Sequence, residues 1–129
     1  MLDQSAIENT VANYFSAIRA SDEDAWIATF ADDAVSYDPV GAPPHEGEDA
    51  LREFFQGINA AFAEIGLHEQ DVFVAGDSAA VKWTGHGVGH NGTEVEFAGI
   101  DVFEINDRGQ IQTLRAYWNP GAVMEKIGG

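Results

Sequence analysis

Apolar residues near the start of the chain recur every three or four positions, the spacing of a helix that buries one face. This pattern predicts a first helix over residues 5–19, opened by a capping box of Ser5 and Glu8. The helix is expected to bury Tyr14. Ser21 is predicted to cap a second, short helix. The chain is therefore expected to begin with two helices.

A short, partly β-branched stretch over residues 34–37 predicts a strand that ends at Asp38, because a following proline favours an extended conformation at the residue before it. Residues 40–47 are rich in proline and glycine and predict a loop. Apolar spacing then predicts a third helix from Leu51 to a point near Gly66.

From Leu67 onward, alternating apolar and polar residues separated by turn signals predict four antiparallel strands. The turn signals are Gly76-Asp77, Asn91-Gly92 and residues 106–109. Helices followed by an antiparallel meander indicate an α+β fold with the helices over one face of the sheet. A length of 129 residues without an internal repeat or linker predicts one domain, residues 1–129.

Asp101 is an acid on the apolar side of a predicted strand. Odd positions of residues 95–105 are otherwise apolar or glycine, whereas Glu94, Glu96 and Glu104 occupy the even side. A buried acid is paired, protonated or used in chemistry, because desolvation alone raises the pKa of a carboxyl group strongly. Asp101 is thus a candidate site residue, although a structural aspartate with its hydrogen bonds satisfied gives the same pattern.

The lengths of the turns decide which side chains share a face with Asp101. A two-residue turn at Asn91-Gly92 places Lys82 opposite Asp101, and the next turn places Leu114 opposite it on the other side. The resulting face is concave and largely apolar with a few polar groups, as in small-molecule pockets. The residues predicted to join Asp101 there are Lys82, Thr84, His86, Phe97, Leu114, Ala116 and Trp118.

Composition narrows the range of partners. Six lysine and arginine residues and 22 acidic residues give a formal net charge of −16, which repels nucleic acids and anionic membranes; adaptation to high salt would produce the same acidity. The absence of cysteine excludes disulfides, thiolate zinc sites and thiol nucleophiles. The four scattered histidines match no metal-ligand motif. The first four residues show no targeting signal, so a cytoplasmic protein is expected.

Several segments resemble the ketosteroid isomerases of the NTF2-like, or SnoaL-like, superfamily. They are Tyr14, Phe30-Ala31-Asp32-Asp33-Ala34, Tyr37-Asp38-Pro39-Val40-Gly41, Ile100-Asp101-Val102-Phe103, Arg108-Gly109-Gln110-Ile111-Gln112 and Ala116-Tyr117-Trp118. The resemblance covers nearly the whole chain. It implies an NTF2-like cone, a curved antiparallel β-sheet wrapped around three N-terminal helices, usually as a homodimer.

The resemblance also implies a reaction, the movement of a β,γ double bond of a 3-ketosteroid into conjugation, without a metal or organic cofactor. Asp38 would be the general base, and Tyr14 and a protonated Asp101 would donate hydrogen bonds to the ketone oxygen. Phe30 and Phe55 stand where some relatives carry tyrosines that support the catalytic one, and both are expected to line the pocket.

Lys82 departs from the isomerase pattern, in which the residue opposite the buried acid is usually apolar. An adjacent ammonium favours an ionised Asp101 about as strongly as burial opposes it, so a neutral donor and an ion pair both remain open. Lys82 could also reach the pocket mouth or act as a cationic oxyanion partner. His86 could be an acid or base, or a hydrogen-bonded wall residue.

Polar side chains at Thr84 and His86 favour a ligand smaller or more oxygenated than a steroid. Two other functions therefore stay open beside the isomerase. One is a SnoaL-like cyclase, lyase or hydrolase that uses the same base. The other is a non-catalytic module that binds a small molecule or dimerises.

Overall fold

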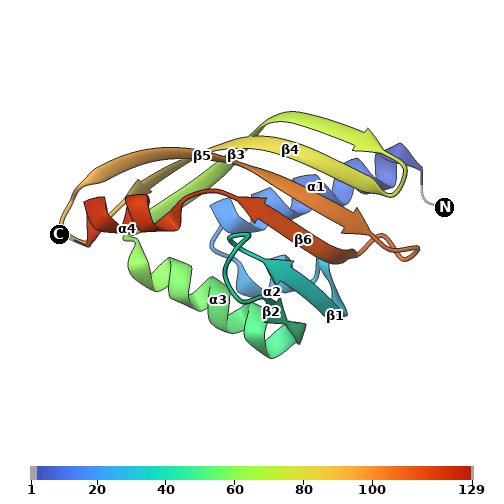
Figure 1. Ribbon diagram of the computed structural model, residues 1–129, viewed down its shortest axis with the longest axis horizontal. Helices are drawn as coiled ribbons and strands as arrows, with labels where there is room; N and C mark the ends of the chain where they lie inside the picture. The colour runs from blue at the N-terminus through green and yellow to red at the C-terminus, as the bar shows by residue number, and fades with distance from the viewer. Residues whose placement is uncertain (1–2, 129) are drawn as a thin grey trace.

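The computed structural model describes residues 3–128, so Met1, Leu2 and Gly129 lie outside the described residues. Its elements are α1 (Gln4–Arg19), α2 (Glu23–Ile27), β1 (Phe30–Tyr37), β2 (His45–Glu46), α3 (Gly47–Ala61), β3 (Glu64–Ala75), β4 (Ser78–Val88), β5 (Glu94–Ile105), β6 (Ile111–Tyr117) and α4 (Pro120–Ile127). Helices come first and a meander of strands follows (Figure 1). The α+β fold class predicted from the sequence is confirmed.

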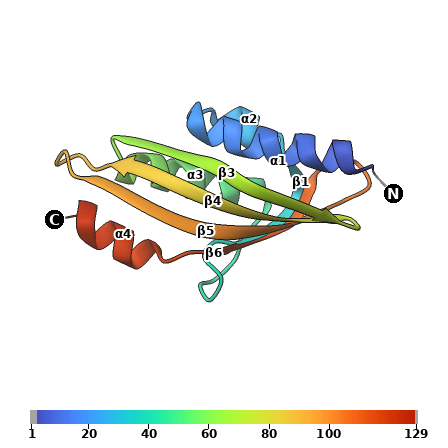
Figure 2. The same ribbon diagram turned by 90° about the horizontal axis from the view of Figure 1, so that it is seen from above.

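The strands form one six-stranded sheet in the order β2-β1-β6-β5-β4-β3. All neighbours are antiparallel except β1 and β6, which run parallel. The four antiparallel strands predicted from residue 67 onward are confirmed as β3 to β6, whereas the parallel pairing of β1 with β6 was not predicted. The long strands β3, β4 and β5 arch over the molecule, and α1 and α2 lie along one side of the sheet (Figures 1 and 2). The sheet is thus curved and unclosed.

Aspartates, and not the predicted serines, cap the first two helices. Asp3 accepts a hydrogen bond from the backbone N–H of Ala6 at 2.9 Å, so α1 begins one residue earlier than predicted and does not use the capping box. Asp22 likewise accepts from Ala25 at 3.1 Å and caps α2. Ser21 instead occupies the turn before it with φ of 52°.

The third helix and the C-terminal segment differ from the sequence prediction. The third helix ends at Ala61, because Phe62 is extended and leads into β3. The helix α4 was not predicted, although Asn119 caps it and Pro120 follows at the first helical position. This helix buries Val123 as part of a small second core.

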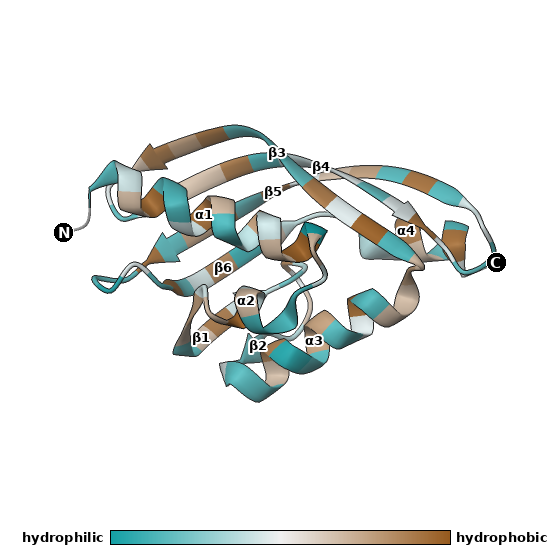
Figure 3. Ribbon diagram, turned by 180° about the vertical axis from the view of Figure 1, so that it is seen from behind, coloured by the Kyte–Doolittle hydropathy of each residue, from teal (hydrophilic) through white to brown (hydrophobic). Residues whose placement is uncertain are grey.

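Alternation along the strands directs the apolar side chains inward. In β4 the odd-numbered residues from Ala79 to Gly87 are buried, whereas Lys82, Thr84 and His86 are exposed. The banded colouring of the strands in Figure 3 follows this alternation. The main core lies between this inner face and the helices, and its fully buried side chains include Ile7, Val11, Phe15, Trp26, Leu51, Val81, Phe103, Ile111 and Leu114.

The β4–β5 hairpin has a three-residue loop, residues 90–92, in place of the predicted two. The backbone N–H of Gly89 donates to the carbonyl of Thr93 at 2.9 Å, and Gly92 closes the loop with φ of 83°. Asp101 therefore pairs with Val81 and not with Lys82. A shift of one residue turns every side chain of a strand to the other face.

Three predicted pocket residues are consequently misplaced. Lys82, Thr84 and His86 lie on the outer face of the sheet, and the expectation that they line the pocket is wrong. Thr84 accepts a hydrogen bond from Gln70 at 3.0 Å, and His86 contacts Glu94 at 3.2 Å.

The β5–β6 pairing is shifted by two residues, which preserves the faces. Asp101 pairs with Ala116, and Leu114 pairs with Phe103 and not with Asp101 as predicted. A register irregularity between Glu104 and the following residue accounts for part of the difference.

Within residues 3–128, no helix combines the length and apolar composition that crossing a membrane requires.

Candidate active site

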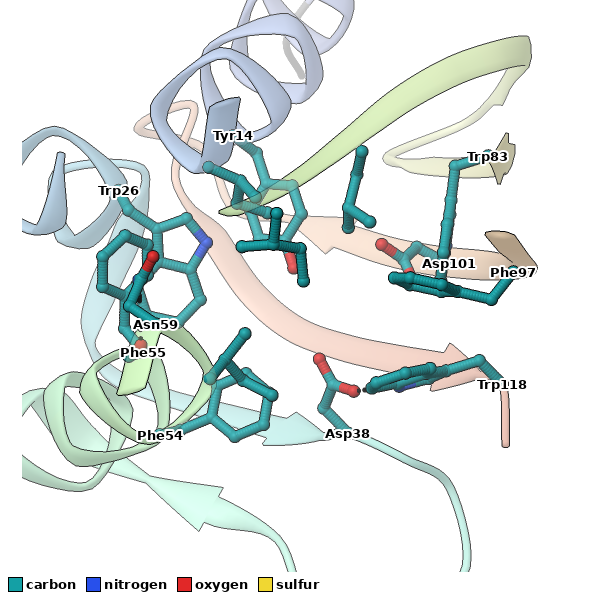
Figure 4. A pocket seen from close by; sticks show the side chains of 14 residues that line it. Tyr14, Trp26, Asp38, Phe54, Phe55, Asn59, Trp83, Phe97, Asp101 and Trp118 are labelled. Atoms are coloured by element: carbon teal, nitrogen blue, oxygen red, sulfur yellow. Dashed lines mark hydrogen bonds between the residues drawn. The ribbon is translucent and has the colours of Figure 1, made fainter. Parts of the chain in front are cut away.

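A narrow cavity lies between α1, α2, α3 and the inner face of the sheet. Tyr14, Asp38 and Asp101 all line it, among mainly aromatic and aliphatic side chains. Figure 4 shows the Tyr14 hydroxyl and both carboxyl groups pointing toward the same space. The free space is about 50 Å³, whereas ligand pockets typically measure roughly 300 to 1,000 Å³. A ligand of steroid size therefore enters only if lining side chains move apart.

Aromatic contacts hold Tyr14 in place. It projects from α1 and is 2% exposed. The rings of Phe15 and Phe103 pack edge-on against it, each with its centroid 5.1 Å away, and Phe30 does so at 6.0 Å. Burial raises the pKa of the Tyr14 hydroxyl well above its usual range, and the nearby acids Asp101 and Asp38 add to the rise. The hydroxyl therefore keeps its proton at neutral pH and is available to donate a hydrogen bond.

Asp38 lies directly after β1, where the following loop is tied to β6 by a backbone hydrogen bond from Val40 to Ala116 of 2.8 Å. The carboxyl group is buried. The indole Nε1–H of Trp118 donates to Asp38 Oδ1 at 2.6 Å. Burial raises the pKa of Asp38 to about 6, against the opposing effects of the Trp118 hydrogen bond and of His45. Most Asp38 side chains are therefore ionised at pH 7.

Asp101 is held in the middle of the sheet, between Val81 of β4 and Ala116 of β6. It is 2% exposed, and its Oδ1 atom has no hydrogen-bond partner among residues 3–128. Burial raises its pKa well above the usual range, the charge of Asp38 raises it further, and Trp83 opposes the rise. The ion pair with Lys82 that the sequence left open is absent from the described residues.

The other predicted pocket residues divide into two groups. Phe55, Phe97 and Trp118 line the cavity. Phe30, Leu114 and Ala116 are instead buried in the surrounding core and do not line it.

Sequence reasoning missed two tryptophans and an amide in the lining, namely Trp26, Trp83 and Asn59. Trp83 is one of the odd-numbered, mostly apolar residues of β4, and that alternation predicts an inward side chain. The assumed turn length predicted the opposite face. Asn59 lies one turn after Phe55 on α3, and its amide donates to the Phe55 carbonyl at 3.0 Å. No sequence motif marks that position.

An apolar cavity with acidic groups inside a curved sheet and helices defines a small-molecule site of an α+β protein. Residues 11–125 match the SnoaL-like domain, and the chain belongs to that family. It is 33% identical to the steroid Δ-isomerase of Nocardioides simplex over 118 residues, which cover 92% of this chain and 94% of that protein. The predicted resemblance is thereby confirmed.

Solved structures show the same fold. SalBIII, described as an epoxide hydrolase/cyclase-like enzyme in pyran ring formation in the polyether salinomycin, is 30% identical with a TM-score of 0.84, covering 92% of this chain and 95% of that one. RV0760c from Mycobacterium tuberculosis, in complex with estradiol-17β-hemisuccinate, is 26% identical with a TM-score of 0.81, covering 90% and 95%. The expected NTF2-like fold, with its curved sheet and N-terminal helices, is confirmed.

Proposed function

We propose that this protein is a cofactor-independent isomerase that moves a β,γ double bond of a 3-ketosteroid, or of a ketone of similar shape, into conjugation. One observation carries the proposal: Tyr14 of α1, Asp38 of the loop after β1 and Asp101 of β5 reach one apolar cavity. The 33% identity to a steroid Δ-isomerase supports it. The estradiol derivative bound to RV0760c, a protein of the same fold, supports a steroid-like ligand.

Asp38 is the general base of the proposed reaction. Its carboxylate removes a proton from the carbon between the ketone and the alkene, and the electron pair of that C–H bond forms a dienolate. The protonated Asp38 then returns the proton to the carbon two positions further along. A pKa of about 6 suits both steps, because the group is ionised at neutral pH and still basic enough to hold the proton.

Tyr14 and Asp101 stabilise the dienolate by donating hydrogen bonds to its oxygen. The donation requires that Asp101 carry a proton, and its burial without a cation favours that state. One such donor typically lowers the barrier by about 3 to 4 kcal/mol. Donors held in place by packing need little reorganisation as charge develops on the oxygen.

A second function is favoured by the likeness to SalBIII, an epoxide hydrolase/cyclase-like enzyme. Ring closure also needs one carboxyl group to remove a proton and another to supply one. Asp38 could be the base and Asp101 the acid, because their environments give the two carboxyl groups different pKa values. Under this alternative, the substrate would be a hydroxy epoxide and the product a cyclic ether, with no change in conjugation.

The test is the appearance of conjugated-enone absorbance in the near ultraviolet when purified protein is mixed with β,γ-unsaturated 3-ketosteroids. Asp38→Asn keeps the shape of the side chain but removes the base, so the rate should fall by about 100- to 10,000-fold. Asp107→Asn, in an exposed turn, is the matched control and should match the wild type. Absence of the enone signal from several such ketones would exclude the isomerase.

A further inference from the structure

The chain has three tryptophans, and each lies beside a different member of the proposed catalytic group. Trp118 donates to Asp38. Trp26 lies beside Tyr14, with the ring centroids 5.9 Å apart. Trp83 shares the inner face with Asp101, and Figure 4 shows its indole, seen edge-on, near that carboxyl group. The proposed reaction assigns a role only to the acids and the tyrosine.

Trp83 is directed toward Asp101 by the absence of a side chain at Gly99, its cross-strand partner. A Cβ atom at Gly99 would lie 2.5 Å from Cζ2 of Trp83, so only glycine leaves room for the indole there. The ring packs edge-on against Phe97 at 5.9 Å and Trp118 at 6.1 Å. Its orientation is thus fixed by these two rings and by the backbone at Gly99.

Trp26 is fixed in a similar way behind Tyr14. It is 1% exposed and packs against Phe30 and Phe55, with ring centroids 4.7 and 5.0 Å away. Figure 4 shows its nitrogen on the side of the ring that faces Tyr14. Phe30 and Phe55 have no hydroxyl groups, so neither can donate a hydrogen bond to the Tyr14 oxygen.

Both indole nitrogens are buried donors without an acceptor. Nε1 of Trp26 and Nε1 of Trp83 have no hydrogen-bond partner among the described residues, and neither does Oδ1 of Asp101. An indole N–H can only donate. An unpaired buried donor destabilises the fold, so its retention calls for an explanation. The Asp101 carboxyl oxygen and the Tyr14 hydroxyl oxygen are acceptors on the same cavity.

We propose that Trp83 and Trp26 are positioning residues. The N–H of Trp83 donates to Asp101 when that carboxyl group is ionised in the free protein, and both N–H groups donate to Asp101 and to the Tyr14 hydroxyl oxygen when those two groups donate their own protons to a ligand oxygen. A carboxylic acid or hydroxyl that accepts a hydrogen bond becomes a stronger donor, because linked hydrogen bonds polarise one another. The indoles would also hold the two protons in the direction of the ligand.

The direction of the pKa effects agrees with this arrangement. Trp26 opposes the rise in the pKa of Tyr14, and Trp83 opposes the rise in the pKa of Asp101. The titratable groups that line the cavity are Tyr14, Asp38 and Asp101, with His45 acting on Asp38 from outside it. An effect of Trp83 on Asp101 can therefore be separated from effects of the other acid by following both carboxyl groups.

The test measures the pKa values of Asp38 and Asp101 by carbon-13 NMR of the carboxyl groups. Trp83→Phe should raise the pKa of Asp101 by about 1 to 2 pH units, as expected when a carboxylate loses one hydrogen bond. Trp118→Phe is the calibrating variant and should raise the pKa of Asp38 in the same way. An unchanged Asp101 pKa in folded Trp83→Phe would overturn the proposal.

A second measurement uses the wild-type protein, so it does not depend on whether Trp83→Phe folds. In the wild type, the indole N–H signal of Trp83 should move downfield as Asp101 ionises, because a hydrogen bond to a charged group is stronger. Adding equilenin, a phenolic mimic of the dienolate, should move the signals of both Trp26 and Trp83. Signals that stay fixed through both titrations would contradict the proposed hydrogen bonds.

The catalytic consequence rests on the proposed isomerase function. Trp83→Phe and Trp26→Phe should each lower kcat by roughly 3- to 10-fold, the effect of one neutral hydrogen bond, with little change in KM. If the wild type shows no isomerase activity, the proposed function fails while the NMR titrations still decide the role of the tryptophans. A 3- to 10-fold fall in kcat/KM that came only from a higher KM would indicate a purely structural role and would overturn the proposal.

Discussion

Asp101 faces Val81 across the β4–β5 hairpin, while its neighbour in sequence, Ile100, faces Lys82 on the opposite side of the sheet. The buried acid therefore has an apolar cross-strand partner and the lysine is in contact with solvent. No ammonium group stabilises the charge of Asp101, so burial is the main influence on its protonation state and favours the protonated form. This pairing is what makes donation of a hydrogen bond from Asp101 chemically reasonable.

Replacing Lys82 should leave the site unchanged. Because Lys82 is exposed on the outer face, Lys82→Met should alter kcat/KM by less than about twofold and stability by less than about 0.5 kcal/mol. Steady-state kinetics and thermal unfolding check both expectations. A large fall in activity, or a changed Asp101 pKa, would show that the lysine reaches the acid after all.

Replacing Asp101 should separate activity from stability. Asp101→Leu removes one donor and should lower kcat/KM by about 100- to 1,000-fold. Its free energy of unfolding should stay the same or increase, because an unpaired polar group leaves the core. Asp101→Asn, which keeps an N–H donor, should recover part of the activity. A loss of stability that parallels the loss of activity would instead indicate a structural role.

The rate should depend on pH through Asp38. The base must be ionised, so kcat/KM should rise with pH and level off above an inflection near 6. A profile measured between pH 4 and pH 8 with a non-ionising ketone substrate checks this. An inflection near pH 4 would mean that the carboxyl group is hydrated and not buried.

Trp118 should shift that inflection. Its N–H group stabilises ionised Asp38 across 2.6 Å, so Trp118→Phe should move the inflection to higher pH by about 1 unit. The matched control is Tyr117→Phe, which alters the exposed ring of the preceding residue at the end of β6. The same shift in both variants would show that the hydrogen bond is not its cause.

Ionisation of Asp38 should raise the rate but lower the stability of the folded protein. The folded-state pKa of Asp38, about 6, exceeds its usual value of 3.8, so its stabilising contribution is complete below about pH 4 and is lost as pH rises through 6. Asp38→Asn should therefore be more stable than the wild type at pH 8, by up to about 3 kcal/mol, and equal to it at pH 4. Denaturant unfolding at both pH values measures the difference.

Much of the fold could be predicted because local signals agreed with one another. Helical spacing identified α1 and the burial of Tyr14, and strand alternation identified Asp101 as a buried acid. The parallel pairing of β1 with β6 could not be predicted, since it joins segments far apart in the chain. The helix α4 was missed although Asn119 and Pro120 form a recognisable start.

The candidate site was mispredicted at one face because of a single loop residue. Asn91-Gly92 suggested a two-residue turn, whereas His90 joins them in a three-residue loop. Side chains alternate between the two faces along a strand, so an error of one residue moves each side chain to the other face. The prediction therefore placed Lys82 on the inner face, where the structure has Trp83. The apolar residues at odd positions of β4 were the stronger signal, since burial decides register more firmly than turn type.

The central claim is that Tyr14 and a neutral Asp101 together bind the oxygen of a dienolate. A crystal structure of the complex with equilenin at pH 7 tests it most directly. The expected result is a single phenolic oxygen within about 2.5 to 2.8 Å of both the Tyr14 hydroxyl and an Asp101 carboxyl oxygen, with Asp38 beside the ring system. An equilenin oxygen that contacts neither group, or that reaches Asp101 only through water, would contradict the account.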